Sequence, residues 1–448
     1  MTTATATTFT SGTAPGALPF IGHGLKLRGQ LLEFLESLPR HGDVVKIMLG
    51  TQPAYVVCHP ELVQKVLLDD RTYEKGGPQM EKLRELIGIG LASVPHDSHR
   101  RQRRLVQPAF SKARMPEYAR VIGADIDATS NSWRDGMVAD IQKDMYGFAV
   151  RTVVRNLFAS GWDAEGIDEM REAMDVAFAG VYERVMAPLG IKEKLPLPSN
   201  RRYERALTTL VSLLDKVIEQ HLKTPEDSGT MLGALIAAEH ADGEVLSARE
   251  LRDTALTMMV GGTDTTSALL TWTLHLLAED PEVARRVMEE SDAVLGGRTA
   301  TWEDTHKLPY MQRVLKESLR LYPPVPLLTR EVTKDTELGG RHIPAGTTVI
   351  YSAYLMHRRA ELFENPDRFD PDRWLDNASA LCRGAYVPFG LGARQCIGND
   401  FATMRGVSTM STWCGRWRFE SVPSAPVRAA GTLTVLHPER VMLRLHKR

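Results

Sequence analysis

The segment around residue 396 combines residue types that could hold a planar ring with a metal at its centre. It consists of Phe389-Gly390-Leu391-Gly392-Ala393-Arg394-Gln395-Cys396-Ile397-Gly398. A cysteine thiolate is a strong anionic metal ligand, and a helix that begins just after it supplies positive potential and free N–H donors. Gly392 and Gly398 let the backbone approach a flat ring, because glycine has no side chain. We therefore expect Cys396 to be a metal ligand.

The other three cysteines lack such surroundings. Cys58, Cys382 and Cys414 form no C-x-x-C pair, and four cysteines are too few for a disulfide framework in 448 residues. A lone cysteine is usually a small buried hydrophobic residue, and we assign that role to these three. The ten-residue context of Cys396 argues against the same assignment there.

A polar segment also interrupts an apolar helix that we expect over residues 255–277. Its centre is Gly261-Gly262-Thr263-Asp264-Thr265-Thr266. Each glycine costs about 1 kcal/mol relative to alanine, and a buried carboxylate costs more unless it is paired. Such costs indicate a functional groove, in which Asp264 and Thr265 could relay protons. The alternative is that Thr265 only bonds back along its helix; the neighbouring Asp264 favours the relay.

His99 and Arg103 lie in a basic run, four residues apart, and so share a helix face. Together they could clamp a carboxylate by charge-assisted hydrogen bonds, with Arg330 as a third donor. The alternative is a solvated basic face, and it stays open for the other arginines of the run. These could instead receive an acidic electron-transfer partner; they are Arg100, Arg101 and Arg104.

The string F-x-x-G-x-R-x-C-x-G at 389–398 resembles the haem-binding loop of the cytochrome P-450 family, and other landmarks of that family follow in order along nearly the whole chain. The resemblance implies haem b (iron protoporphyrin IX) with Cys396 as axial ligand, whose anionic sulfur favours O–O cleavage. It implies that Asp264 and Thr265 are catalytic. The implied cofactor-binding residues are His99, Arg103, Gly261, Gly262, Arg330, Phe389, Gly392, Arg394, Cys396 and Gly398.

The resemblance also implies a buried structural triad of Glu317, Arg320 and Arg373. A Glu-x-x-Arg pair alone carries little information, because exposed pairs of this kind recur in the chain and contribute at most about 1 kcal/mol. The sequence after this pair, Leu321-Tyr322-Pro323-Pro324, and the segment Phe369–Trp374 select it. We expect a scaffold role.

The elements that must position these residues are mainly helical, with small β-sheets. A hairpin is expected from Val44–Leu49 and Ala54–Cys58, and helical periodicity dominates from residue 61 to 290. Ser247-x-x-Glu250 is a capping box that would start the long helix, and Asp280-Pro281 would start the next one. We expect the P-450 fold as a single domain over 14–448, preceded by a flexible tail at 1–13.

Composition narrows the class of protein. Forty-three per cent hydrophobic residues, 25 per cent charged residues and a net charge of -1 are typical of a globular protein without a nucleic-acid partner. No apolar stretch reaches the roughly 18 residues of a membrane span, and the start resembles no signal peptide. We therefore expect a cytoplasmic bacterial protein without a membrane anchor, and a monomer.

The expected substrate pocket is apolar, which suits a ligand with few polar groups. The family layout implies Phe178, Val181, Met186, Met258, Val325, Leu327, Leu328 and Leu433. Each of these residues could equally be ordinary core. The segments 185–190 and 195–203 resemble bacterial family members that oxidise sesquiterpenes.

The leading hypothesis is a monooxygenase that uses O₂ and hydroxylates a small terpenoid. Electrons from NAD(P)H would arrive through a ferredoxin reductase and a ferredoxin, because the chain has no dinucleotide-binding fingerprint and no cysteine cluster. The alternatives are a fatty-acid, macrolide or other secondary-metabolite hydroxylase, an enzyme of the same fold that works by peroxide or rearrangement, and a haem-binding protein without turnover. Such a carrier would need no proton relay.

Overall fold

The computed structural model describes residues 8–158, 164–185, 195–223, 229–238, 243–375, 384–422, 427–430 and 435–448. The helices are α1 (Gly24–Gly29), α2 (Leu31–Ser37), α3 (Pro60–Leu68), α4 (Pro78–Ile87), α5 (His96–Val106), α6 (Met115–Ser132), α7 (Ile141–Phe158), α8 (Ala164–Val185), α9 (Pro198–Lys223), α10 (Met231–Ala237), α11 (Ala248–Glu279), α12 (Pro281–Leu295), α13 (Trp302–Thr305), α14 (Pro309–Leu321), α15 (Ala353–His357) and α16 (Asn399–Arg416). The strands are β1 (Ser11–Thr13), β2 (Val44–Leu49), β3 (Gln52–Val57), β4 (Tyr73–Glu74), β5 (Val138–Asp140), β6 (Leu328–Val332), β7 (Thr336–Leu338), β8 (Arg341–Ile343), β9 (Thr348–Tyr351), β10 (Trp417–Ser421), β11 (Ala429–Ala430), β12 (His437–Pro438) and β13 (Met442–Lys447).

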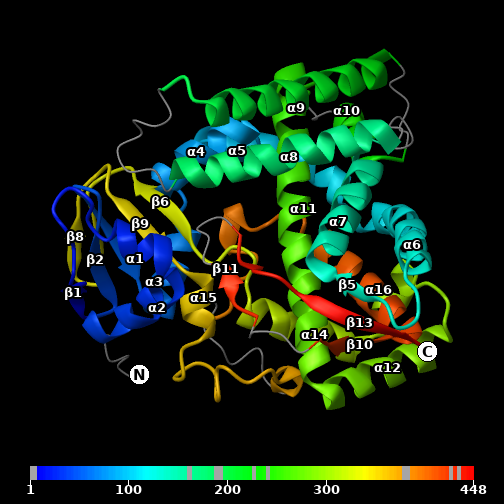
Figure 1. Ribbon diagram of the computed structural model, residues 1–448. Helices are drawn as coiled ribbons and strands as arrows, with labels where there is room; N and C mark the ends of the chain where they lie inside the picture. The colour runs from blue at the N-terminus through cyan, green and yellow to red at the C-terminus, as the bar shows by residue number, and fades with distance from the viewer. Residues whose placement is uncertain are drawn as a thin grey trace, which may run out of the picture.

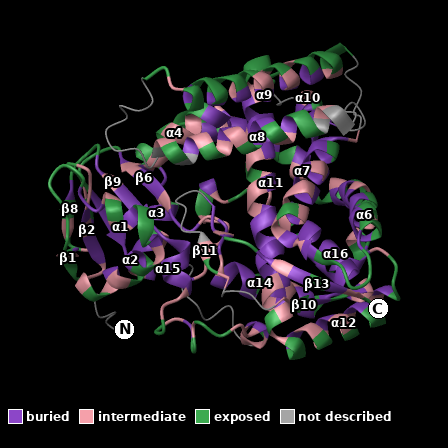
Figure 2. Ribbon diagram, in the orientation of Figure 1, coloured by how far each residue is buried: buried purple, intermediate pink, exposed green. Residues whose placement is uncertain are grey.

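The helical part surrounds α11, and the largest sheet lies to one side of it (Figure 1). Helices α8 and α9 pack on each other across one end of α11. Buried residues follow the length of α11 and the strands of the large sheet, so each part has its own apolar core (Figure 2). The mainly helical fold that the sequence predicts is therefore present.

The large sheet has the strand order β1-β2-β3-β9-β6-β4. The predicted hairpin is β2 and β3, with Val44 opposite Val57 and Leu49 opposite Gln52. β1 pairs in parallel with β2. The expectation of a flexible tail up to residue 13 is therefore wrong for residues 11–13, because their backbone hydrogen bonds are satisfied by the sheet edge.

Helix α11 begins and ends where its capping residues predict. Ser247 accepts a hydrogen bond from the Glu250 amide while the Glu250 side chain accepts from the Ser247 amide, and Asp280 caps the helix that follows. Its 32 residues span about 48 Å at 1.5 Å per residue. No helix among the described residues is long and apolar enough to cross a membrane.

The three triad residues lie together behind the site. Glu317 and Arg320 are both fully buried and joined by two hydrogen bonds of 2.8 and 2.9 Å. Arg373 donates to the same carboxylate at 2.8 Å, and Trp374 donates at 3.0 Å. Arg320 also donates to the carbonyl of His357 at 2.9 Å. The triad therefore fastens α14, α15 and the turn at 371–374 to one another.

His357 connects this scaffold to the chain that leads into the cysteine loop. Its Nε2 accepts the Val387 amide at 2.9 Å, which requires a neutral ring in the folded protein. Burial, with the nearby positive Arg320, lowers the pKa of His357 to about 3. The unfolded chain takes up a proton below about pH 6.5, whereas the folded chain does not. Folding stability is therefore lost as the pH falls from about 6.5 toward 3.

We expect His357→Gln to flatten this acid dependence. The glutamine oxygen can still accept from Val387 but takes up no proton, so between pH 6.5 and 4 the free energy of unfolding should fall less steeply, by about 1.4 kcal/mol per pH unit. Urea unfolding at a series of pH values measures this slope. The exposed His306 provides the control, His306→Gln, which should leave the slope unchanged. Equal slopes in wild type and His357→Gln would contradict the assignment.

Candidate functional site

Cys396 lies at the end of a loop that the following helix and α5 hold in place. Its amide donates to the Phe389 carbonyl at 2.8 Å, and α16 begins three residues later. The thiol is accessible yet deep enough for removal from bulk water to raise its pKa; the Gly398 amide and the positive Arg103 and Lys75 oppose that rise. The Gly398 amide and the two positive side chains would stabilise the anionic form of the sulfur, which is the form that binds a metal.

The two predicted loop glycines differ in their surroundings. Gly392 has φ +69°, and a side chain there would lie 2.9 Å from the Leu67 carbonyl. Gly398 has Phe110 and the Cys396 sulfur at 3.6 and 4.0 Å from the position of a Cβ. Gly392 is therefore required by the loop's packing on α3, whereas the absence of a side chain at Gly398 leaves the space beside the sulfur free.

The groove glycines of α11 also have separate roles. A Cβ on Gly261 would meet nothing within 4 Å, whereas a Cβ on Gly262 would lie 2.9 Å from Val153 of α7. Gly261 thus faces open space, and Gly262 allows the close approach of α7. Thr265 donates to the Gly261 carbonyl at 2.5 Å, so the back-bond that the sequence left open is present in this structure.

Asp264 of α11 points toward polar side chains. Its carboxylate is 3.0 Å from Nε2 of His437 in β12. Both residues line a cavity of about 340 Å³ between α7, α8, α11 and β12, whose other lining residues are Asp140, Gln142, Lys143, Tyr146, Asp175 and Ser267. Burial raises the pKa of Tyr146, and the negative Asp175 and Asp264 add to this, so its hydroxyl keeps its proton. The cavity is a polar route to Asp264.

Positive side chains converge on the space beside the cysteine loop. Arg394 donates to Asp70 at 3.1 Å and to the Val94 carbonyl at 2.8 Å, and its remaining Nη2 is buried without a partner among the described residues. Arg330 is 2% exposed, and its Nε and Nη1 likewise have no partner in the described part of the chain. A buried hydrogen-bond donor without an acceptor lowers the stability of the fold, and a bound anion would supply the missing acceptor atoms to this cluster.

His99 and Arg103, predicted as a pair, have different surroundings. His99 is buried, and burial with the positive Arg394 and Arg103 lowers its pKa to about 3, so it is neutral at pH 7. Arg103 donates instead to the carbonyls of Ala393 and Gln395, at 3.0 and 2.8 Å. Arg103 therefore holds the cysteine loop itself in this structure.

The residues present fit a haem. Its two propionates would meet the unpaired donors of Arg330 and Arg394, and its iron would meet the accessible thiol of Cys396. Lys75, which the sequence analysis did not assign, belongs to the same cluster. Burial and the positive Arg330 and Arg394 lower its pKa well below the usual range, and a bound anion would reverse that effect. Lys75 follows Tyr73-Glu74 in the sequence, and no motif there indicates a binding role.

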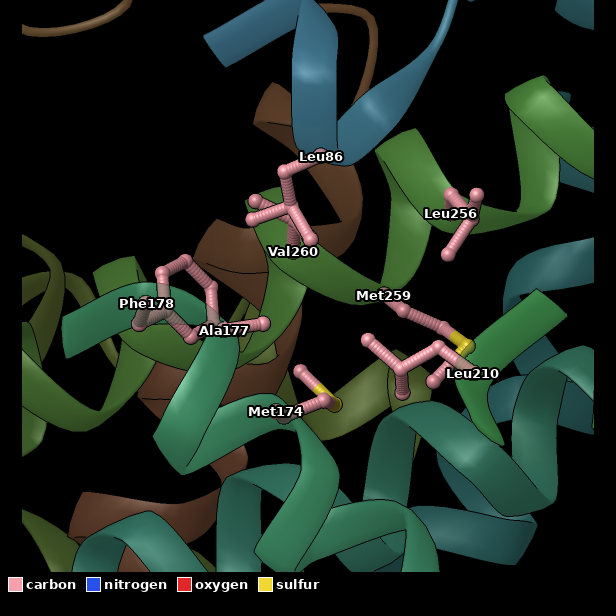
Figure 3. A pocket seen from close by; sticks show the side chains of 8 residues that line it. All are labelled: Leu86, Met174, Ala177, Phe178, Leu210, Leu256, Met259 and Val260. Atoms are coloured by element: carbon pink, nitrogen blue, oxygen red, sulfur yellow. The ribbon is translucent and has the colours of Figure 1, made fainter. Parts of the chain in front are cut away.

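An apolar wall lies beside the groove, just before Gly261. It contains no polar side chain, and Phe178, Ala177 and Met174 of α8 face Leu256, Met259 and Val260 of α11, with Leu86 and Leu210 beside them (Figure 3). These side chains leave no room for a water molecule between them. A ligand at this wall must therefore move α8 or displace side chains.

Other predicted pocket residues are distributed over both cores. Met258 packs against the main core, Val181 is buried in it, and Leu327 is buried in the core of the large sheet. Val325 is partly exposed, and Leu328 begins β6. Met186 and Leu433 lie outside the described residues, as does Cys382. Cys58 and Cys414 are buried as predicted, and burial raises the pKa of each to about 12.

Comparisons with known proteins show the family to which this chain belongs. A family model described as Cytochrome P450 matches residues 13–444. Cyclooctat-9-en-7-ol 5-monooxygenase of Streptomyces melanosporofaciens is 44% identical over 93% of this chain and 91% of its own length. Pentalenene oxygenase of Streptomyces avermitilis is 40% identical over 98% of each chain. The crystal structure of the cytochrome P450DA haem domain is 25% identical, with a TM-score of 0.88 over 98% of both chains.

We expect Arg330→Leu to weaken haem retention. The substitution removes a buried charge whose Nε and Nη1 have no partner among the described residues, and the loss of a charge-assisted hydrogen bond should speed haem transfer to excess apomyoglobin by about tenfold. Arg341→Leu, on β8 and stacked over Tyr55, is the matched control and should transfer haem at the wild-type rate. Unchanged transfer from Arg330→Leu would show that Arg330 does not hold the cofactor.

Proposed function

The chain belongs to the cytochrome P450 family and is a haem-thiolate monooxygenase, and we propose that it hydroxylates a cyclic terpene hydrocarbon with electrons from a ferredoxin. The observation that carries this proposal is the wholly apolar wall of Figure 3, whose α11 residues directly precede Gly261 in the sequence. A hydrocarbon needs no polar partner, and a buried polar group without one would weaken its binding. Pentalenene oxygenase is named for a hydrocarbon and supports this substrate class. The other relative is named for a cyclic alcohol, cyclooctat-9-en-7-ol, and supports a cyclic carbon skeleton but not the absence of a hydroxyl group.

The chemistry that haem supplies when bound is the reductive activation of O₂. The chain's own part begins with Cys396, whose loop is held by Arg103 and by the Cys396 amide. Arg330 and Arg394 neutralise the acidic edge of the cofactor, and His99 stays uncharged beside them. Once α8 or the side chains of the wall have moved to admit it, the hydrocarbon would be oriented by the apolar wall, which would also keep water away from it.

Asp264 and Thr265 would move protons between two environments. Adjacent on α11, they face different sides: Asp264 lines the polar cavity, and Thr265 bonds to Gly261, which borders open space. In the proposed relay, the Asp264 carboxylate takes up a proton from the cavity and passes it to Oγ1 of Thr265, which releases its own proton to the groove after its back-bond to the Gly261 carbonyl has opened. A carrier without turnover has no use for this arrangement.

The proposed electron donor is an acidic ferredoxin that binds near α5. Because Arg103 of α5 holds the cysteine loop, this helix lies on the thiolate side of the site. Arg100 and Arg104 are exposed there, whereas Arg101 is already bound to Glu250 at 2.6 Å. The two exposed arginines are therefore the ones available to attract an acidic partner.

Substrate class can be tested by the shift of the iron spin state on titration. We expect pentalenene to produce a saturable shift toward high spin, and lauric acid and a macrolide to produce little. Phe178→Ala should weaken pentalenene binding by about tenfold, because much of the contact area of one aromatic ring is lost. A saturable shift with lauric acid or the macrolide alone would overturn the terpene proposal while leaving the family assignment intact.

The relay can be tested with Thr265→Ala, measured as product formed per NAD(P)H consumed. Loss of the hydroxyl should slow the proton-dependent step by about 10²-fold or more, so that most of the NAD(P)H is consumed without product and the ratio falls. Thr271→Ala is the matched control: Thr271 makes the same back-bond, to Ser267 at 2.7 Å, but is fully buried two turns away. An unchanged ratio in Thr265→Ala would exclude the relay.

A further inference from the structure

Arg405 of α16 is a fully buried arginine that joins three helices. One of its terminal nitrogens, Nη1, donates to the Thr152 hydroxyl of α7 at 3.1 Å. The other, Nη2, donates to the Gly262 carbonyl and the Thr266 hydroxyl of α11. The guanidinium therefore contacts the groove helix at the turn that carries Asp264 and Thr265.

The charge of Arg405 has no counter-ion among the described residues. It makes no ion pair in that part of the chain, its Nε has no partner there, and its guanidinium lies 5.2 Å from the centre of the Phe401 ring. Burial lowers its pKa to about 9, so it remains charged at neutral pH. Removing an unpaired charge from water is expensive, and an apolar side chain would fill this position at lower cost. Packing alone does not account for an arginine here.

The side-chain hydrogen bonds of the threonines in α11 show how Arg405 changes the bonding of Thr266. Four other threonine hydroxyls of this helix donate to the carbonyl four residues earlier, at 2.5–2.8 Å; these are Thr257, Thr265, Thr271 and Thr273. The buried hydroxyls of Thr254 and Thr263 have no partner among the described residues. The corresponding acceptor for Thr266 is the Gly262 carbonyl, and Arg405 binds both of these groups. At this turn the threonine hydroxyl and the carbonyl four residues earlier are hydrogen-bonded to Arg405 of another helix. At the four other turns the same two groups are hydrogen-bonded to each other.

Two neighbouring rows of α11 are thereby distinguished. Gly261 and Thr265, four residues apart, form the row that faces open space. Gly262 and Thr266 form the next row, which is fixed between Val153 of α7 and Arg405 of α16. Because residues four apart share a helix face, fixing one row sets the rotation of the helix and hence the direction of the other.

We propose that Arg405 is a positioning residue for the oxygen-binding groove: by holding Gly262 and Thr266, it sets the rotation of α11 that directs Thr265 at the haem. Arg405 contacts neither substrate nor cofactor in this proposal. It binds α11, and it affects the reaction through the position of Thr265. A planar guanidinium can bind two oxygens at once, which a lysine ammonium on a flexible stem does with less geometric restraint.

Arg405→Met in the haem-loaded enzyme tests the proposal. Methionine keeps the length and fills the space, so the thermal midpoint should stay equal or rise. Amide exchange over residues 261–266 should become about tenfold faster, the change expected when a charge-assisted hydrogen bond is lost. The C–O stretching band of the reduced CO complex, which depends on the groups facing the bound gas, should shift and broaden. Arg405→Lys should give a smaller change in both signals.

Trp413→Phe is the matched control on the same helix. Its indole donates to the Ile126 carbonyl of α6 at 3.2 Å and not to α11. This variant should lower the thermal midpoint while leaving the CO band and the exchange of 261–266 at wild-type values. If Arg405→Met fails to fold, Thr266→Val removes one partner of the guanidinium without touching the charge and should shift the band in the same direction. A wild-type CO band and wild-type exchange in the folded variants would overturn the proposal.

Discussion

Helix α11 is buried for most of its length and yet carries polar groups at its centre. The helices that pack against α11 must therefore satisfy those polar groups. Gly262 lets α7 approach, Arg405 binds the same turn from α16, and Trp272 donates to the Leu436 carbonyl at 2.8 Å two turns further on. Each neighbour satisfies a polar group or fills a gap that the groove creates. The exposed face of Gly261 is what remains uncovered.

The second requirement is electrostatic. Arg330 and Arg394 present buried N–H donors that have no acceptor among the described residues, and Lys75 lies with them, so the protein part of the site carries an excess of buried positive charge. A dianionic cofactor compensates this charge, which couples haem binding to the stability of the fold. The cysteine loop can meet such a cofactor because it is fixed from both sides, by Arg103 of α5 and by His357 through Val387.

The same helix also separates the oxidising side of the site from the proton supply. Asp264 turns to His437 and the polar cavity, while Thr265 turns to the groove. Apolar side chains of α8 and α11 leave no room for water between them, whereas the cavity beside Asp264 is lined by polar side chains. In the proposed function, this separation would keep the route for protons apart from the site of the hydrocarbon.

Local patterns in the sequence determined the cysteine loop, both ends of α11, the hairpin β2–β3 and the Glu317–Arg320 pair, because capping residues, glycines and short motifs act over a few residues. Tertiary structure alone decided the rest. β5 is three residues long and exists through its pairing with β13, and β1 through β2. Arg405, Lys75 and His437 stand in unremarkable sequence, and their roles depend on neighbours more than a hundred residues away. The cofactor role of Arg103 stays a prediction from its spacing and the family resemblance, while its two hydrogen bonds to the carbonyls of the cysteine loop depend on how that loop folds.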